Sequence, residues 1–210
     1  MVDTFKVYLA EAGGEEVRVF ERPHLHEFLA RVSERYETHI FTAAQEVYAR
    51  PILKNLDPHG EIFTHCWYRE SCNLDQDIVA YIKDMQPMFG KDRMKRTVLV
   101  DNNPLSFLAN PENGILVSSF YNDPRDTTLV AVLDLLEELD ALEDVRPKLD
   151  ARFGLRRALQ EVSQKGTAVP GVRDKQLDDS ATASTTVSST LDTDDEEEEP
   201  TPSWTAAASR

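Results

Sequence analysis

Three polar side chains in this sequence border short apolar runs and could together bind an anion and a divalent cation. Thr42 follows a predicted strand, and its hydroxyl can donate a hydrogen bond to an anion. Lys83 can neutralise a phosphate as a point charge. Asp101 ends an apolar run and precedes Asn102, and a carboxylate beside an amide suits a hard cation such as Mg²⁺. The order hydroxyl, ammonium, carboxylate therefore predicts a site that binds a phosphate together with a metal ion.

Each of these residues also has a simpler explanation. Thr42 could be the N-cap of the helix that follows it. Asp101 could shape a turn before Pro104. Lys83, taken alone, would be an ordinary surface lysine. The residues by themselves leave these alternatives open, and the order of the three is what favours a shared site.

The elements that would position these side chains alternate between short strands and amphipathic helices. This alternation favours an α/β fold: a three-layer, doubly wound, mostly parallel sheet that binds ligands beyond the carboxyl ends of its strands. Gly13 and Gly14 predict a hairpin turn, and Pro23 is expected to open a helix. Strands are expected over 5–9, 17–20, 38–41, 97–100 and 115–120, and helices over 46–56 (with Pro51 kinking it or starting its second part) and 129–142.

Composition limits the class of protein. The net charge of −15 argues against binding nucleic acid through its phosphates, which needs a basic surface. Cys66 and Cys72 match no zinc motif and make no disulfide framework, so we expect two reduced thiols in a nuclear or cytoplasmic protein. The sequence contains no run of about 20 apolar residues and no secretory signal pattern at its start.

The chain divides near residue 165. Residues 1–160 carry the periodic apolar pattern of one domain. Residues 165–210 are rich in Ser, Thr, Ala and acidic residues, and we expect a disordered tail. Its acidic run, 192–199, is interpreted as a solvated charge run, and Thr193 within it as a weak candidate for phosphorylation.

Several blocks, in order along residues 5–155, resemble the small phosphatases that act on the C-terminal repeats of RNA polymerase II. These belong to the haloacid-dehalogenase superfamily and share the FCP1 homology domain. The blocks are Phe20-Glu21-Arg22-Pro23-His24, Phe41-Thr42-Ala43, Tyr68-Arg69-Glu70-Ser71-Cys72, Tyr81-Ile82-Lys83-Asp84, Val98-Leu99-Val100-Asp101-Asn102-Asn103-Pro104 and Asn113-Gly114-Ile115.

The resemblance implies a Mg²⁺-dependent protein phosphatase that acts on phosphoserine or phosphothreonine through an aspartyl-phosphate intermediate. Thr42 would then hydrogen-bond the phosphoryl oxygens and Lys83 would offset their charge. Asp101 would hold Mg²⁺, with help from Asn102. The partner would be a phosphorylated protein, with RNA polymerase II repeats as one candidate.

The resemblance also makes two arginines, Arg22 and Arg69, candidates for contacting the substrate, because they fall in blocks that border the active cleft. Substrate specificity would come from a small β-rich insert, roughly residues 60–82.

The sequence departs from this family at one motif. The family's nucleophile and general acid lie in an Asp-x-Asp-x-Thr motif after a central strand, and no such strand and motif occur here. The nearby residues Asp3 and Thr4 are not a shortened copy. The pattern at 75–77 lies on the insert side of the fold and follows no apolar strand, and the pattern at 192–194 lies in the tail. We therefore expect the first catalytic strand to be missing, its neighbours to carry unpaired amides, and the chain to be an incomplete record or to start at an internal methionine.

Two other functions stay open. One is a catalytically inactive pseudophosphatase that binds phosphopeptides. The other is a relative of the receptor of this fold in the mitochondrial import machinery, although the transit peptide and membrane span typical of that branch do not occur in the sequence.

Overall fold

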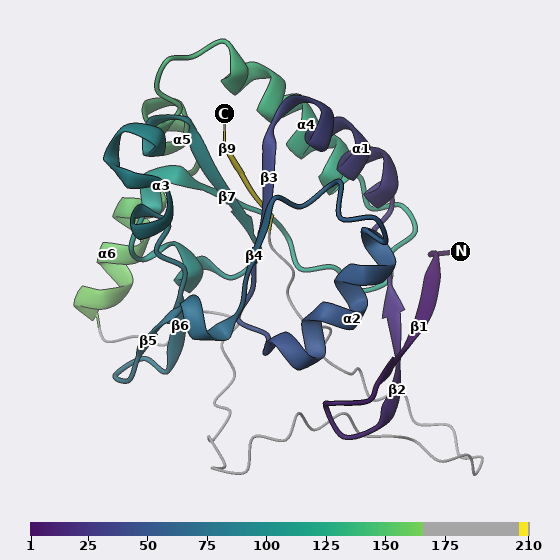
Figure 1. Ribbon diagram of the computed structural model, residues 1–210. Helices are drawn as coiled ribbons and strands as arrows, with labels where there is room; N and C mark the ends of the chain where they lie inside the picture. Colours follow the sequence, from purple (N-terminus) through teal and green to yellow (C-terminus); the bar gives the residue numbers. More distant parts are fainter. Residues whose placement is uncertain (166–205, 210) are drawn as a thin grey trace.

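The computed structural model of the chain describes residues 1–165 and 206–209, and its centre is a mixed sheet with helices around it (Figure 1). Among these residues the sheet has the strand order β4-β3-β9-β7-β8. β3 is parallel to β4, β7 is parallel to β8, and β9 runs antiparallel to both β3 and β7. The strands are β3 (Glu37–Phe41), β4 (His65–Trp67), β7 (Thr97–Asp101), β8 (Gly114–Leu116) and β9 (Ala206–Ser209).

Helices cover both faces of this sheet. Alternate side chains of β7 point to opposite faces, and each set packs against a different group of helices. Val98 and Val100 pack with one group of helices, and Leu99 packs with another. Figure 1 shows α1 and α4 together on one side of the sheet, with α3 and α6 on the other. The first group is α1 (Leu25–Arg35), α4 (Thr128–Asp140) and α5 (Arg146–Phe153), and the second is α3 (Gln86–Arg93) and α6 (Leu155–Lys165).

The chain begins with the predicted hairpin, formed by β1 (Thr4–Leu9) and β2 (Glu15–Phe20). Gly13 and Gly14 have φ values of 108° and 76°, which residues with a side chain rarely adopt, and so they allow the turn. Val7, Leu9 and Val17 are buried against Ile52 of α2 (Glu46–Leu56).

A second, smaller sheet lies in the chain between β4 and α3. It consists of β5 (Asn73–Asp75) and β6 (Ala80–Ile82), which pair antiparallel. Four short 3₁₀ turns complete the described structure: η1 (Arg69–Ser71), η2 (Met94–Arg96), η3 (Pro104–Phe107) and η4 (Pro111–Asn113).

The structure shifts several predicted boundaries. The helix expected to open at Pro23 begins at Leu25, because His24 has a left-handed backbone, with φ 67°. The strand expected over 115–120 ends at Leu116, the residue opposite Asp101 at the end of β7. Val117, the next residue, still donates its backbone N–H to the Asp101 carbonyl oxygen (2.9 Å).

Helix α2 has the predicted bounds, and Pro51 lies inside one continuous helix, so the prediction of a second part beginning there is wrong. Asn55 Nδ2 donates a hydrogen bond to the Pro51 carbonyl oxygen (3.0 Å).

The predicted disordered tail lies outside the described residues except for 206–209, which form β9. This strand overturns the expectation that the strands beside a missing first strand carry unpaired amides, because β9 pairs with both β3 and β7. None of the described helices combines the length and the hydropathy needed to cross a membrane. Cys66 and Cys72 are free thiols, and both are half-buried.

Candidate functional site

A buried ion pair joins two of the predicted site residues. Lys83 follows β6 and Asp101 ends β7, and Lys83 Nζ lies 2.7 Å from Asp101 Oδ2. The two side chains are 1% and 0% exposed, so the interpretation of Lys83 as a surface lysine is wrong. Charges so deeply buried are found in proteins almost only when they are paired. The lysine backbone is fixed as well, because its N–H donates to the Ser106 carbonyl (3.1 Å).

The second oxygen of Asp101 shapes the turn that follows. Asp101 Oδ1 accepts a hydrogen bond from the Asn103 N–H (2.8 Å). Asn103 Oδ1 in turn accepts from the Leu105 N–H (3.1 Å) and caps η3. The turn-forming explanation of Asp101 is therefore confirmed, together with its position beside the buried lysine.

Thr42 follows β3 and is not a helix N-cap, since Gln45 occupies that position in α2. The hydroxyl oxygen of Thr42 accepts a hydrogen bond from the Ala44 N–H (3.0 Å), and the residue is 1% exposed. The hydroxyl keeps its own O–H for donation to another group.

The sheet register brings Thr42 and Asp101 to the same edge. Ile40 and Val100 are both Cα partners of Ala206, so β3 and β7 end at the same level. Because β3 and β7 run in the same direction, the residues after them lie at one carboxyl edge. The structure thus brings together the three residue types from which the site was predicted.

Arg69 fixes the loop that contains Thr42. Its Nε donates to the Ala43 carbonyl (2.7 Å), and its guanidinium carbon lies 5.2 Å from the centre of the Tyr81 ring. Its backbone N–H donates to the Ala44 carbonyl (3.0 Å). A role for Arg69 in contacting a substrate stays a prediction.

Cys72 lies among these residues and was not predicted as part of the site. Its Sγ is 3.7 Å from the Thr42 carbonyl oxygen. Burial, opposed by the charges of Lys83 and Arg69, raises the pKa of the Cys72 thiol to about 11, so the thiol stays protonated at neutral pH. The only sequence signal for it was its position at the end of the block 68–72.

Asn102 and Arg22 lie toward the β8 side of the edge. Asn102 Nδ2 donates to Ser119 Oγ (3.0 Å). Arg22 donates from Nε and Nη2 to the two carboxylate oxygens of Asp126 (3.0 and 2.8 Å), and from Nη2 to the Ser118 carbonyl (2.9 Å). Burial acts to raise the pKa of Asp126, but the hydrogen bonds from Arg22 and Thr128 together outweigh it and hold that pKa below its usual range. Arg22 therefore ties the end of β2 to the segment before α4.

We expect Arg22→Leu to lower the free energy of unfolding by about 2 kcal/mol, because Asp126 would keep its burial and lose a charged donor. The two side chains are 14% and 12% exposed. Arg125→Leu is the matched control, since Arg125 also pairs with an aspartate, Asp123, but is 88% exposed. Urea unfolding of both variants measures the difference, and equal costs would show that the Arg22 pair stabilises no more than a surface ion pair.

A metal ion fits this edge only in part. Asp101 and Asn102 offer one carboxylate and one amide, and the described residues contain no group of three or more His, Cys, Asp or Glu side chains arranged for a metal. Mg²⁺ in phosphoryl-transfer sites is commonly held by one or two carboxylates plus waters and the substrate phosphate. Asp101 and Asn102 therefore match only part of the ligand set that such a site commonly uses.

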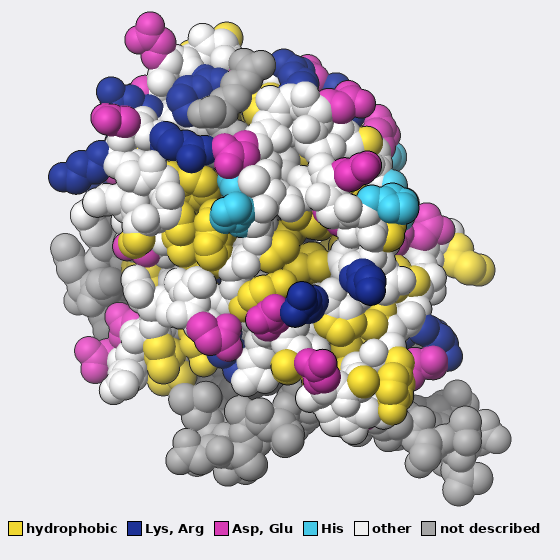
Figure 2. All heavy atoms as spheres, in the orientation of Figure 1, with side chains coloured by type: hydrophobic (Ala, Val, Ile, Leu, Met, Phe, Trp, Pro, Cys, Tyr) yellow, Lys and Arg dark blue, Asp and Glu magenta, His cyan; other side chains and the backbone are white. Residues whose placement is uncertain are grey.

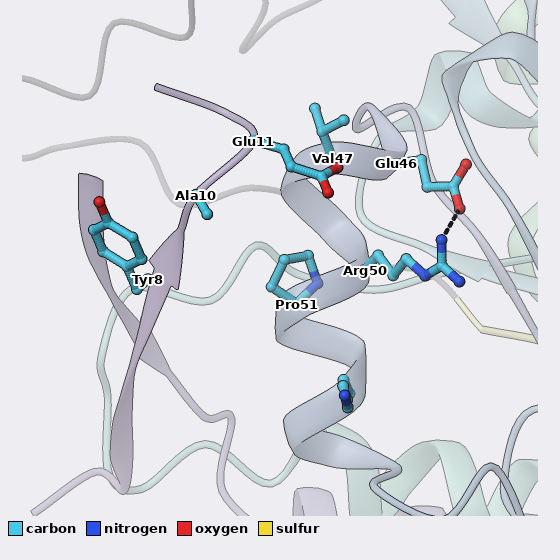
Figure 3. A pocket seen from close by; sticks show the side chains of 8 residues that line it. Tyr8, Ala10, Glu11, Glu46, Val47, Arg50 and Pro51 are labelled. Carbon is cyan, nitrogen blue, oxygen red and sulfur yellow. Dashed lines mark hydrogen bonds and ion pairs between the residues drawn. The ribbon is translucent and has the colours of Figure 1, made fainter. Parts of the chain in front are cut away.

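Two hollows lie near these elements. One, of about 260 Å³, adjoins the carboxyl edge and is lined by Asn102 and Arg22 together with many apolar side chains. The other, of about 480 Å³, lies between the end of the hairpin and α2 (Figure 3). It includes none of the predicted site residues, and the charges of Glu46 and Arg50 within it pair with each other (3.2 Å). The first hollow is lined by two of the predicted residues, Asn102 and Arg22, but not by Thr42, Lys83 or Asp101.

A buried histidine lies in β3 within an aromatic cluster. His39 is 2% exposed, and its ring centre is 5.0 Å from that of Trp67 and 5.2 Å from that of Phe89. Figure 2 shows hydrophobic and histidine side chains together in the middle of the face where Figure 1 shows β4. Neither ring nitrogen of His39 makes a hydrogen bond in the described structure, although Glu37 Oε1 is 3.4 Å from Nε2.

Burial, helped by the charges of His65 and Arg93 and opposed by Glu37, lowers the pKa of His39. In the unfolded chain the same side chain titrates near 6.5. The unfolded state therefore binds the proton more readily, so the stabilisation is complete above about pH 6.5 and is lost as the pH falls toward the lower folded pKa. We expect this residue to contribute at most about 1.4 kcal/mol of stability change per pH unit in that range.

Urea unfolding measured from pH 7.5 to pH 5 checks this expectation. His39→Phe should flatten the pH dependence, and the exposed control His59→Gln should leave it unchanged. If the free energy of unfolding of His39→Phe depends on pH as steeply as that of the wild type, the pH dependence comes from other groups.

The described elements form an α/β fold with a central mixed sheet. The solved structure "The Structure of Fcp1, an essential RNA polymerase II CTD phosphatase" aligns with 82% of this chain and 65% of its own, with a TM-score of 0.55 and 19% identity, which supports the shared fold. The family model "NLI interacting factor-like phosphatase" matches residues 2–146, and the chain belongs to this family.

Curated relatives agree with this assignment. "CTD small phosphatase-like protein 2" of Dictyostelium discoideum is 39% identical over 72% of this chain. "Carboxy-terminal domain RNA polymerase II polypeptide A small phosphatase 2" of Homo sapiens is 37% identical over 66% of it, and "CTD nuclear envelope phosphatase 1B" of Danio rerio is 37% identical over 62%. The matches span only 26%, 49% and 52% of the length of these three relatives.

Proposed function

We propose that this chain forms the phosphoryl-binding part of a Mg²⁺-dependent protein phosphatase for phosphoserine and phosphothreonine. The observation that carries the proposal is the buried Lys83–Asp101 pair at the sheet edge that also holds Thr42. A phosphate dianion at this edge would receive a hydrogen bond from the Thr42 hydroxyl and attraction from the lysine. Phosphoryl transfer depends mainly on such positioning and charge neutralisation.

Asp101 and Asn102 would hold the metal beside the phosphate site. When bound, Mg²⁺ would polarise the phosphoryl oxygens and offset their charge. The protein substrate would be a phosphorylated segment, with RNA polymerase II repeats as a candidate because relatives carry that name. A nuclear location is supported in the same way by the names of relatives.

Hydrolysis through an aspartyl-phosphate needs a carboxylate nucleophile, and the family's Asp-x-Asp-x-Thr motif does not occur after an apolar strand in this sequence. The observation that favours a second candidate is this lack. In that candidate the chain binds a phosphopeptide and does not hydrolyse it. Both candidates use the same phosphate site, so binding and turnover are measured separately.

The direct test is calorimetric titration of the chain with a phosphothreonine peptide and with its unphosphorylated counterpart, at several MgCl₂ concentrations. We expect binding that requires the phosphate. Thr42→Val should weaken it about tenfold or more, because a hydrogen bond to a charged group contributes about 1.5–3 kcal/mol. The matched control is Thr64→Val at an exposed threonine. Equal affinity for the two peptides would refute both candidates.

Turnover distinguishes the two candidates. Phosphate release from the same peptide, dependent on Mg²⁺, would support the phosphatase. Phosphate-dependent binding without release would support the binding module.

A further inference from the structure

The small β5–β6 hairpin exposes apolar side chains that the fold does not bury. Leu74 is 49% exposed, Ile78 is 45% exposed and Val79 is 51% exposed. These three residues lie within six consecutive positions of the chain, and Figure 1 shows the hairpin projecting at the lower left of the molecule. A single exposed apolar residue is ordinary, but a group of them at one projecting tip is typical of an interaction surface.

The core holds one face of this hairpin, and the other face points outward. Ala80 of β6 is buried in the same core cluster as Phe107. Leu74 pairs with Tyr81 across the two strands, and residues directly opposite in an antiparallel pair project to the same face. Because successive strand residues alternate between faces, Leu74 and Tyr81 lie on the face opposite Ala80. The hairpin is therefore anchored on one side and presents Leu74 on the other.

The outward face leads to the candidate phosphate site. The Arg69 guanidinium lies 5.2 Å from the centre of the Tyr81 ring, and Arg69 Nε donates to the carbonyl oxygen of the residue after Thr42 (2.7 Å). Lys83 directly follows β6. Val79 lies four residues before Lys83, so that their Cα atoms are at most about 13 Å apart. A peptide with its phosphate between Thr42 and Lys83 would reach the hairpin about two to five residues from its phosphorylated residue.

The charge of the hairpin indicates which segments it would attract. Residues 70–79 contain Glu70, Asp75 and Asp77 and no Lys, Arg or His. Asp75 Oδ1 shapes the turn by accepting from two backbone N–H groups (3.0 and 3.3 Å), whereas Glu70 and Asp77 are exposed. The net charge of −15 also repels a phosphate dianion. Basic residues beside the phosphorylated one would offset this repulsion and complement the hairpin.

We propose that the β5–β6 hairpin docks the residues beside the phosphorylated one in a protein ligand. It selects segments with a large apolar residue and Lys or Arg within about two to five residues of the phosphoresidue. Leu74, Ile78 and Val79 bury the apolar side chain, and Glu70 and Asp77 attract the cations. The inference rests on the proposed function, because it adds a class of substrate to the same phosphate site.

The test measures the binding of fluorescent phosphothreonine peptides to the full chain by anisotropy, with MgCl₂ present. The reference peptide, Arg-Leu-Arg-Ala-pThr-Ala-Arg-Leu-Arg, carries the selected residues on both sides, so that its direction in the site does not matter. One comparison peptide has Glu in place of every Arg, and another has Ser in place of every Leu. We expect the reference to bind at least about tenfold more tightly than the Glu peptide and about threefold more tightly than the Ser peptide.

Two apolar variants test whether the hairpin produces the preference for Leu. Leu74→Ser combined with Ile78→Ser should bring the reference and the Ser peptide to equal affinity, because the apolar surface is lost. Val130→Ser on α4 is the matched control, since Val130 is 36% exposed and lies on another element. The control should keep the threefold preference of about the wild-type size.

Two acidic variants test the preference for Arg in the same way. Glu70→Gln combined with Asp77→Asn should reduce the ratio between the reference and the Glu peptide at least about threefold. Glu34→Gln, at an exposed residue of α1, is the matched control and should leave the ratio unchanged. Raising the NaCl concentration should also reduce the ratio in the wild type, because salt screens exposed charges.

Several outcomes would overturn the inference. Equal affinity for the three phosphorylated peptides would refute it and leave the phosphate site intact. Preferences that the hairpin variants leave unchanged would show that another surface selects the peptides. Absence of binding by a folded sample would refute both the inference and the proposed function.

The unphosphorylated forms of the same three peptides separate the inference from the proposed function. If they bind as tightly as the phosphorylated forms and show the same preferences, the docking surface is supported and the phosphate site is refuted. If the phosphate is required and the preferences are present, both proposals are supported.

Discussion

Lys83→Met is expected to lower the free energy of unfolding by about 3–5 kcal/mol. The substitution keeps the length of the side chain and removes its charge, and so leaves the Asp101 carboxylate buried without its ionic partner. Removing one member of a buried pair is costly because the remaining charge stays desolvated. Urea unfolding followed by circular dichroism measures the change.

Two control variants test whether this loss of stability comes from the unpaired carboxylate of Asp101. Lys83→Met combined with Asp101→Asn removes both charges and keeps an oxygen that can accept from the Asn103 N–H, so the double variant should recover at least about half of the lost stability. Lys6→Met breaks an ion pair with Glu16 whose side chains are 57% and 54% exposed, and should cost at most about 1 kcal/mol. A double variant as unstable as the single one would contradict this explanation.

Phe107→Ala is expected to lower the free energy of unfolding by about 3–5 kcal/mol, because it empties a fully buried position in the core between η3, α3 and α6. Tyr121→Ala, at a residue that is 67% exposed, should change stability by no more than about 0.5 kcal/mol. The same urea unfolding measurement applies.

Gly114 supplies an internal check on the packing around Phe107. A Cβ at Gly114 would lie 2.7 Å from Phe107 Cδ1 and 2.6 Å from Leu155 Cδ1. Gly114→Ala alone should therefore cost about 1–3 kcal/mol from overpacking. In the Phe107→Ala background the ring is gone and Leu155 has room to move, so the added cost should fall below about 1 kcal/mol. Additive costs would show that the two residues do not share this space.

Local sequence signals predicted several elements well. The hairpin around Gly13 and Gly14 and the bounds of the 46–56 helix followed from a turn signal and from apolar spacing, and both act within a few residues of the chain. The start of α1 was placed two residues too early, because the left-handed conformation of His24 leaves no mark in the pattern of apolar residues.

The site residues were predicted unevenly. Lys83 was predicted to offset the charge of a phosphate and Asp101 to hold Mg²⁺, and the structure pairs the two side chains directly with each other. Arg22 was predicted as a substrate contact, and the structure engages it with Asp126, 104 residues away in the chain. Neither the half-buried environment of Cys72 nor the burial of His39 could be read from the sequence, since both depend on neighbours contributed by distant segments.

The sequence by itself determined the family of the chain, the alternation of strands and helices, and the order of hydroxyl, ammonium and carboxylate along it, because these are properties of residue identity and short-range spacing. Only the tertiary structure decided that Lys83 and Asp101 form a buried pair and that Ala206–Ser209 lies between β3 and β7. The physical reason is that ion pairing and strand pairing depend on distance in space, and residues far apart in the sequence come within that distance only when the whole sheet has formed.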